Sequence, residues 1–251
     1  MLISEISKCM QWESQSQPMI QIMNQKDGRF ASEMNLYNPY SKVSCLLLYL
    51  YTLELSQPPL YAVLNKARRT MDTQHLMTLG PFSYGLFSVL QRAEENRNRV
   101  ERIKPGIEYK EDVLDNYAGL FMLFKGAKMR PAWIEEYRRQ DPLKQIKWPG
   151  NTGCSQSIKV ALDDALFENQ GDEGYIPVLF SICMKNYQRF TGVRLCNENY
   201  SAYPSENDTL LMEETSVFTL GVEDHLIQNT HPGFEDYYNM RMTIIYLYHA
   251  R

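Results

Sequence analysis

The spacing of apolar residues divides the chain into a helical first half and a second half rich in strands. In the first half, apolar residues recur every three or four positions, the period of a helix with one buried face. We predict a helix that opens at about residue 38, with Ser41 as its N-cap. A second helix is expected after Pro58-Pro59, and a third over about Pro81–Arg102.

The second half contains short apolar runs bounded by glycine and polar residues, which is typical of strands. Two further helices are predicted there, at Pro131–Arg139 and at Ile158–Phe167, the latter after a turn at Gly150–Ser155. Helices first and strands later indicate an α+β domain with an antiparallel or mixed sheet. The predicted strands are Gly119–Phe124, Tyr175–Met184, Thr209–Met212, Ser216–Val222 and Met240–His249.

The first 37 residues have a different character from the rest. They are rich in Gln, Ser, Met and Asn, with only scattered apolar positions. Such a segment buries little apolar surface, so we predict an N-terminal arm or extension over residues 1–37 and one domain over residues 38–251. The apolar cluster at Met19–Met23 is expected to pack on its own domain, and docking on a partner protein is the alternative.

Composition narrows the class of protein. The 251 residues are 44% hydrophobic and 22% charged, which suits a folded, soluble domain. The net charge of −4 argues against nucleic-acid binding, because affinity for a phosphate backbone needs clustered Lys and Arg. Apolar runs such as Cys45–Tyr51 are too short to cross a bilayer, so no membrane insertion is expected.

The cysteines indicate the compartment. Five cysteines without regular spacing make a poor disulfide framework, and the absence of a CxxC pair argues against a zinc site. The start of the chain also lacks the basic and apolar pattern of a secretion signal. We therefore expect an intracellular protein in a reducing compartment, most naturally the cytoplasm, with no metal ion.

One pattern, in two parts, lies in the helical half. Tyr51-Thr52 falls near the predicted end of the first helix, and the second helix carries the run Leu60–Arg68 (LYAVLNKAR). Three more patterns lie in the second half. They are Leu123-Phe124-Lys125-Gly126, then Asn151–Ser155 with Val160-Ala161 and Phe167, and finally Tyr200–Leu211 continuing through Val217-Phe218 to Val222.

In this order and spacing, the four patterns resemble the mono-ADP-ribosyltransferase superfamily of clostridial-toxin type and its eukaryotic relatives. The resemblance covers roughly residues 38 to 250. It implies an ADP-ribosyltransferase-like α+β fold, in which a helical N-terminal half precedes a mainly antiparallel or mixed, split sheet. It also implies NAD as the co-substrate.

In that family an Arg holds the phosphates of NAD, a Ser-Thr-Ser strand supports the site, and the second Glu of an ExE motif contacts the ribose. A carboxylate is needed there because the bond between nicotinamide and ribose breaks with developing positive charge. The first Glu of ExE engages the acceptor side chain in arginine-modifying members.

The present chain departs from all three motifs. At the Arg position stands Lys125, followed by Gly126; Lys keeps the charge but loses the planar fork that grips a pyrophosphate. At Ser-Thr-Ser stand Thr152, Gly153 and Cys154. Thr152 keeps a hydroxyl, whereas Cys154 is a weak hydrogen-bonding group, and a buried structural thiol is favoured over a nucleophile.

The ExE position reads Glu206-Asn207-Asp208. Asp208 is one methylene shorter than Glu, which displaces its carboxylate by about 1–1.5 Å and costs on the order of a hundredfold in rate. A shifted alignment on Glu213-Glu214 fits the flanking residues less well. The alternative without catalysis is that Glu206 and Asp208 decorate a turn before a strand.

Phe167 has two interpretations: stacking on nicotinamide, as the resemblance implies, or core packing. Three hypotheses for the whole chain follow. The first is a catalytically impaired pseudoenzyme that serves as a structural or protein-binding module and has protein partners. The second is a divergent, active mono-ADP-ribosyltransferase or NAD glycohydrolase. The third is an unrelated α+β interaction domain.

Overall fold

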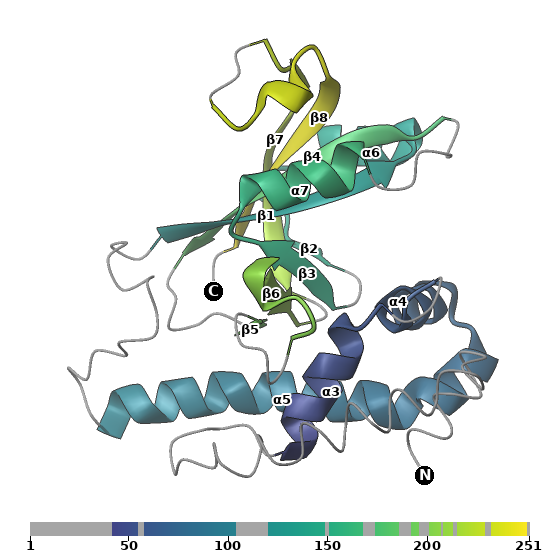
Figure 1. Ribbon diagram of the computed structural model, residues 1–251, viewed down its shortest axis with the longest axis vertical. Helices are drawn as coiled ribbons and strands as arrows, with labels where there is room; N and C mark the ends of the chain where they lie inside the picture. Colours follow the sequence, from purple (N-terminus) through teal and green to yellow (C-terminus); the bar gives the residue numbers. More distant parts are fainter. Residues whose placement is uncertain are drawn as a thin grey trace.

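The computed structural model confirms the predicted α+β class. It describes residues 42–54, 58–103, 120–148, 151–167, 174–185, 192–195, 201–206, 208–212, 215–228 and 232–249. Within these residues, a layer of helices is followed in sequence by one mixed sheet (Figure 1). The predicted arm and position 207 lie outside the described residues.

The helical layer consists of α3 (Lys42–Thr52), α4 (Leu60–Thr70) and α5 (Thr73–Ile103). It forms the base of the molecule in Figure 1, with the sheet above it. Leucines at helical spacing meet in a buried core between these helices. Leu195 and Leu210, which belong to the strand half of the chain, are buried in the same core and join the helical layer to the sheet.

The third helix begins eight residues earlier than predicted, at Thr73 in place of Pro81. Pro81 lies inside α5, because the turns on either side of it carry the buried residues Leu79 and Phe82 into the core. Packing of these residues outweighs the backbone hydrogen bond that proline removes. Asp72 marks the actual start.

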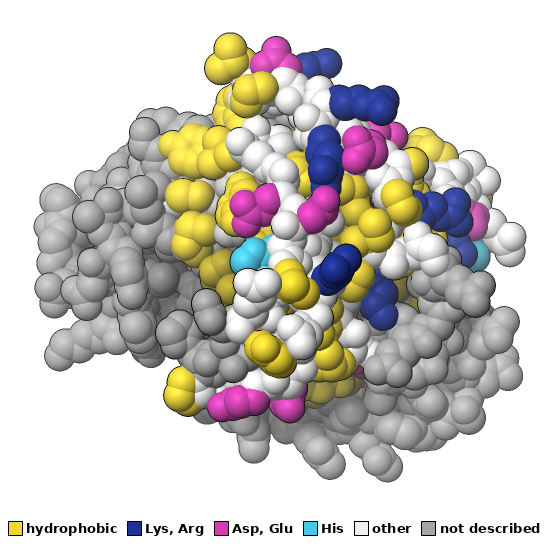
Figure 2. All heavy atoms as spheres, turned by 90° about the horizontal axis from the view of Figure 1, so that it is seen from above, with side chains coloured by type: hydrophobic (Ala, Val, Ile, Leu, Met, Phe, Trp, Pro, Cys, Tyr) yellow, Lys and Arg dark blue, Asp and Glu magenta, His cyan; other side chains and the backbone are white. Residues whose placement is uncertain are grey.

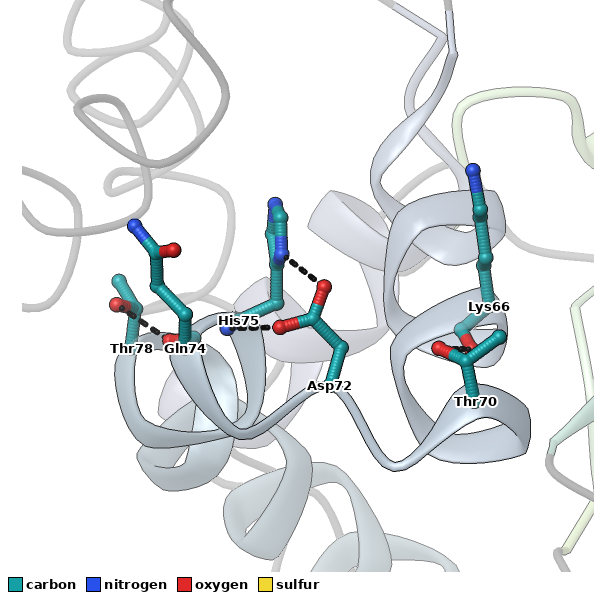
Figure 3. A network of polar contacts seen from close by, with 6 residues as sticks. All are labelled: Lys66, Thr70, Asp72, Gln74, His75 and Thr78. Atoms are coloured by element: carbon teal, nitrogen blue, oxygen red, sulfur yellow. Dashed lines mark hydrogen bonds and ion pairs between the residues drawn. The ribbon is translucent and has the colours of Figure 1, made fainter.

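The Asp72 carboxylate caps α5 by accepting a hydrogen bond from the backbone N–H of His75 at 3.2 Å (Figure 3). Its second oxygen lies 2.8 Å from Nδ1 of the His75 ring. These contacts with His75 lower the pKa of Asp72, so the cap is charged at neutral pH.

Eight described strands form the sheet, in the order β2-β7-β8-β4-β1-β3-β6-β5. All neighbouring pairs are antiparallel except β4 and β8, which run parallel. The strands are β1 (Leu120–Met129), β2 (Ile146–Lys147), β3 (Thr152–Ser155), β4 (Ile176–Lys185), β5 (Gly192–Arg194), β6 (Asp208–Leu211), β7 (Ser216–Leu226) and β8 (Arg241–His249).

All five predicted strands are present, and β1 and β7 are longer than expected. The predicted turn at Gly150–Ser155 was wrong in its second part, because β3 occupies Thr152–Ser155. This segment lacks a run of apolar residues, and it is extended because it is paired on both sides, with β1 and β6. β2 and β5 were not predicted, since strands of two or three residues carry no periodic pattern.

Two helices cover opposite faces of the sheet. α6 (Pro131–Arg138) buries Ile134 against a core that includes Val178 and Phe180 of β4. α7 (Ile158–Leu166) lies across β1 in Figure 1 and shares a core with Leu179, which points to the other face of β4. The central strands are therefore buried on both sides.

Among the described residues, no helix is both long enough and apolar enough to cross a lipid bilayer. Figure 2 shows the described surface from above the view of Figure 1. On this face acidic and basic side chains are interspersed, without a broad patch of one sign.

Candidate functional site

A polar cleft lies where strands β1, β3 and β6 meet the helical layer. Its volume is about 530 Å³, within the range of small-molecule sites. The helical wall supplies residues of α3 and α4, and the sheet supplies the floor. The lining includes Tyr51, Thr52, Glu54, Tyr61, Asn65, Arg69, Phe124, Lys125, Gly126, Trp148, Asn151, Thr152, Gly153, Cys154, Ser155, Asp164, Ser201, Tyr203, Glu206 and Asp208.

The strand register forms a row of side chains across the floor. Phe124 of β1 lies opposite Ser155 of β3, and Ser155 lies opposite Asp208 of β6. Residues paired across a sheet point to the same face, so these three side chains stand side by side. The aromatic ring and the carboxylate are thus separated by two strand spacings, with a small hydroxyl between them.

Gly126 is required where α7 packs against β1. A Cβ atom at this position would lie 2.0 Å from the backbone oxygen of Ala161 and 2.6 Å from the backbone nitrogen of Ala165, both in α7. A side chain there is excluded by backbone that has no freedom to move aside. This explains why a glycine follows Lys125, independently of any ligand.

Lys125 lines the cleft and is half-buried. Its Nζ donates a hydrogen bond to the backbone oxygen of Gly153 at 3.2 Å. The ammonium group therefore bridges β1 and β3 at the floor and places one positive charge there. Arg69 of α4 supplies a second cation to the lining, from the helical wall.

Asp208 has an unusual protonation equilibrium. Burial, together with the neighbouring carboxylates Glu206 and Asp164, raises its pKa to about 7, while Lys125 acts in the opposite direction. The group is therefore about half ionised at neutral pH. A carboxyl group of this kind donates or accepts a proton near pH 7, as general acids and bases do.

Glu206 ends the short 3₁₀ helix Pro204–Glu206, two residues before the start of β6. Its backbone oxygen accepts a hydrogen bond of 2.7 Å from Oγ of Ser155. The side chain of Glu206 lines the cleft beside Asp208. The two predicted carboxylates thus lie in the same cleft, held to β3 through Ser155.

Thr152 and Cys154 also line the cleft, but both are buried. They alternate with Gly153 and Ser155 along β3 and so point to the other face of the sheet. Burial raises the pKa of the Cys154 thiol to about 12, with Lys125 opposing the shift and Asp208 adding to it. Cys154 is consequently a protonated, unreactive thiol at neutral pH.

Phe167 does not line the cleft. It follows the last turn of α7, and its ring lies against that of Tyr237, with centroids 5.7 Å apart. The side chain is 37% exposed at this location. Its contact is with the segment before β8, which agrees with packing and not with stacking on a ligand in the cleft.

The site also contains residues that the sequence analysis did not assign. Ser155 closes the matched segment Asn151–Ser155, but only Thr152 and Cys154 of this segment were predicted as site residues. The available signal was the polar side chain of Ser155 within the matched motif itself. Tyr51, Asn65 and Asn151 form a buried hydrogen-bonded node at the start of β3. Tyr51 and Asn65 were quoted as parts of motifs, but their partner lies about a hundred residues away in sequence.

Within the described residues, no group of three or more His, Cys, Asp or Glu side chains is arranged to hold a metal ion. The polar groups that line the cleft are three cations (Arg69, Lys125 and Lys128), several carboxylates and several hydroxyls, with aromatic rings at its edges. This donor set suits an organic ligand that carries anionic groups and a ring system.

The helical layer, the mixed sheet and the cleft together define the class of fold. The sequence matches no protein-family model and no curated protein sequence. Solved structures do resemble the chain. The Vis toxin, an ADP-ribosyltransferase from Vibrio splendidus, superposes with a TM-score of 0.53 at 12% identity, covering 94% of this chain and 86% of the toxin.

Two further structures give the same result. The ADP-ribosyltransferase HopU1 of Pseudomonas syringae pv. tomato has a TM-score of 0.53 and 16% identity, over 88% of this chain and 82% of its own. The eucaryotic mono-ADP-ribosyltransferase ART2.2 has a TM-score of 0.54 and 14% identity, over 100% and 84%. At these identities the likeness establishes the fold alone: the chain has an ADP-ribosyltransferase-like fold over most of its length.

Proposed function

We propose that this chain is an ADP-ribosyltransferase-like pseudoenzyme: it keeps a cleft for an NAD-type dinucleotide but catalyses transfer poorly. In a larger assembly it would serve as a structural or protein-binding module. The observation that carries the proposal is Asp208, a shortened carboxylate with a pKa of about 7, at the position where the resemblance implies a catalytic Glu.

The residues present fit a dinucleotide. Lys125 and Arg69 supply positive charge for a pyrophosphate, and the rings of Tyr61 and Trp148 offer apolar surface for a base. The volume of about 530 Å³ is adequate for such a ligand. A bound dinucleotide would supply the bond between nicotinamide and ribose that transferases cleave.

The same residues do not fit efficient catalysis. Stabilising positive charge on the ribose requires a fully ionised carboxylate, and Asp208 is only about half ionised at pH 7. Its shorter side chain also leaves the carboxylate about 1–1.5 Å back from the reach of a Glu, on the order of a hundredfold in rate. Lys125 cannot form the two parallel hydrogen bonds of an Arg, and its Nζ already donates to Gly153.

A protein-binding role rests on the exposed face of the helical layer. Met77 and Tyr84 lie seven residues apart on α5, two helical turns, and are 83% and 74% exposed. Large apolar side chains aligned on a helix favour a protein contact. Native co-purification from the source cells tests this part: a chain that always behaves as a lone monomer contradicts it.

One further candidate is a divergent, active mono-ADP-ribosyltransferase or NAD glycohydrolase. The observation in its favour is that Lys125 of β1 shares one cleft with Glu206 and Asp208, which come from a distant segment, and with the Ser155 hydroxyl. Each retains part of the polarity that the reaction needs.

Calorimetric titration with NAD and an assay for released nicotinamide separate the two candidates. We expect the purified protein to bind NAD weakly and to release nicotinamide no faster than buffer. The double variant Lys125→Arg/Asp208→Glu restores the fork and the longer carboxylate, so it should release nicotinamide measurably. A triple variant that also carries Glu206→Gln is the control, because it tests whether any gain comes only from engagement of the acceptor side chain by Glu206.

Two results contradict the proposal. Nicotinamide release by the unmodified protein at the rate of the double variant would establish an active enzyme. If neither protein gives a heat of binding at millimolar NAD, the cleft does not bind a dinucleotide.

A further inference from the structure

The last two residues of α3 each bind a different wall of the cleft. The hydroxyl of Tyr51 donates a hydrogen bond to the backbone oxygen of Asn151 at 3.0 Å, one residue before β3. Oγ1 of Thr52 accepts a hydrogen bond of 3.0 Å from the backbone N–H of Ala202, in the segment that leads to Glu206. These contacts span 100 and 150 residues of sequence, respectively.

The Tyr51 contact is reinforced by α4. Nδ2 of Asn65 donates to the same oxygen of Asn151 at 3.0 Å and to the Tyr51 hydroxyl at 3.2 Å. The Tyr51 side chain is only 4% exposed and its ring lies 6.0 Å from that of Tyr61, so it has little freedom to move. Burial raises the pKa of Tyr51, which keeps the hydroxyl protonated as a donor.

The Thr52 contact is directional. Its hydroxyl donates to the backbone oxygen of Tyr49 at 2.9 Å, which leaves a lone pair for the N–H of Ala202. At the other end of the segment that contains Ala202, the backbone oxygen of Glu206 accepts a hydrogen bond of 2.7 Å from Oγ of Ser155 in β3. Segment 201–206 is thus fastened near one end to α3 and at the other end to β3.

Adjacent residues on a helix point about 100° apart, so the two side chains reach two separate segments from one helix end. We propose that Tyr51-Thr52 is a two-pronged positioning device: Tyr51 fixes the wall formed by β3, and Thr52 fixes the wall that carries Glu206 and Asp208. The device acts on the cleft of the proposed function, but its action on the walls does not depend on a ligand.

Positioning of this kind sets the spacing between Ser155, Lys125 and Asp208. Errors of about 1 Å in such spacings are large on the scale of binding and catalysis. Neither Tyr51 nor Thr52 needs to touch a ligand for this effect. The cleft is consequently sensitive to the helical layer, although its polar floor belongs to the sheet.

Backbone hydrogen exchange, measured by mass spectrometry on the full chain without NAD, tests the two prongs separately. Thr52→Val keeps the shape of the side chain and leaves the N–H of Ala202 without its acceptor. We expect exchange in 201–206 to become about tenfold faster, with 151–155 unchanged. Tyr51→Phe should give the reverse pattern, with faster exchange in 151–155 and none of the change in 201–206.

Two further variants separate positioning from general stability. Thr52→Ser keeps the hydroxyl and should restore slow exchange in 201–206. Thr70→Val is the matched control, because Oγ1 of Thr70 donates to the backbone oxygen of Lys66 at 3.0 Å at the end of α4 (Figure 3). Neither of these two residues lines the cleft. Thr70→Val should leave both segments unchanged.

Three results overturn the proposal: Thr52→Val with unchanged exchange in 201–206, either single variant accelerating both segments equally, or Thr52→Ser behaving like Thr52→Val. If Thr52→Val fails to fold, Tyr51→Phe and Thr52→Ser decide between the same alternatives. Failure to bind NAD contradicts the proposed function and leaves the exchange pattern, and with it the positioning device, intact.

Discussion

Two glycines occupy adjacent strands of the cleft floor, yet their surroundings are opposite. Phe124 pairs with Ser155, and β1 and β3 run antiparallel. Gly126, two residues after Phe124, therefore lies opposite Gly153, two residues before Ser155. A Cβ atom on Gly126 would collide with the backbone of α7, whereas a Cβ atom on Gly153 would meet nothing within 4 Å. α7 therefore packs against β1 at Gly126 but does not extend over β3 at Gly153.

The two positions show that a glycine in this floor can have two different causes. At Gly126 the glycine is a condition of folding, because the helix packs directly on the strand. At Gly153 packing allows any small side chain, so the open space belongs to the cleft. Substitutions at and around the two positions test this distinction, from the largest expected effect to the smallest.

Gly126→Ala should have the largest effect. The added methyl would require α7 to move away from β1, so we expect a loss of about 3 kcal/mol or more in the free energy of unfolding. Urea denaturation followed by circular dichroism measures it. A loss below about 1 kcal/mol would show that α7 is not seated on Gly126 as described.

Asp208→Asn should change how stability depends on pH. The pKa of Asp208 is about 7 when folded and near 3.8 when unfolded, so the folded state binds more protons between pH 4 and 7. The protein should lose stability as pH rises through this window. The amide removes the titration, and we expect the variant to be more stable by about 2 kcal/mol at pH 8 and by little at pH 4.

Denaturant midpoints from pH 4 to pH 8 check this prediction, with Asp236→Asn, a change at an exposed aspartate, as the control. Parallel curves for the protein and for Asp208→Asn would contradict the raised pKa.

Tyr237→Phe should have a smaller effect. The Tyr237 hydroxyl donates to Oδ1 of Asp163 at 2.6 Å and so ties α7 to the segment before β8. Loss of one such hydrogen bond costs about 1 kcal/mol. Thermal unfolding measures the change. A loss of stability as large as that of Gly126→Ala would mean that the Tyr237 hydrogen bond, and not the packing of α7 on Gly126, holds the helix.

Gly153→Ala should have the smallest effect and the opposite sign. Glycine within a strand is unfavourable by roughly 0.5–1 kcal/mol relative to alanine, and the cleft has room for the methyl. We expect a stability equal to or slightly above that of the unmodified protein in the same urea series. A marked loss would remove the contrast between the two glycines.

The sequence predicts the long elements well, because burial on one or both faces gives them a readable apolar pattern. β4 and β8 are such cases, predicted within one or two residues of their observed bounds. The apolar pattern did not indicate β3, because pairing on both sides, and not its own residues, makes it a strand; only the resemblance to a Ser-Thr-Ser strand implied it. The start of α5 was placed too late because core packing around Pro81 overrides the usual effect of proline.

For the site, the motifs along the chain were sufficient to predict that Lys125, Glu206 and Asp208 lie in one cleft. It did not place Phe167, whose direction depends on the contact with Tyr237. Nor did it reveal that Tyr51 and Thr52 hold both walls, since a hydrogen bond to a backbone atom a hundred residues away leaves no trace in local spacing.

The place of β8 in the sheet has a consequence for biosynthesis. It is the last described strand in chain order, yet it lies between β7 and β4 in the interior of the sheet. Until it has emerged from the ribosome, β4 and β7 both present unpaired edges, and the sheet remains in two parts. Cotranslational folding of this chain is therefore completed late, and a nascent chain stalled before residue 241 would expose two strand edges to chaperones and to other copies of itself.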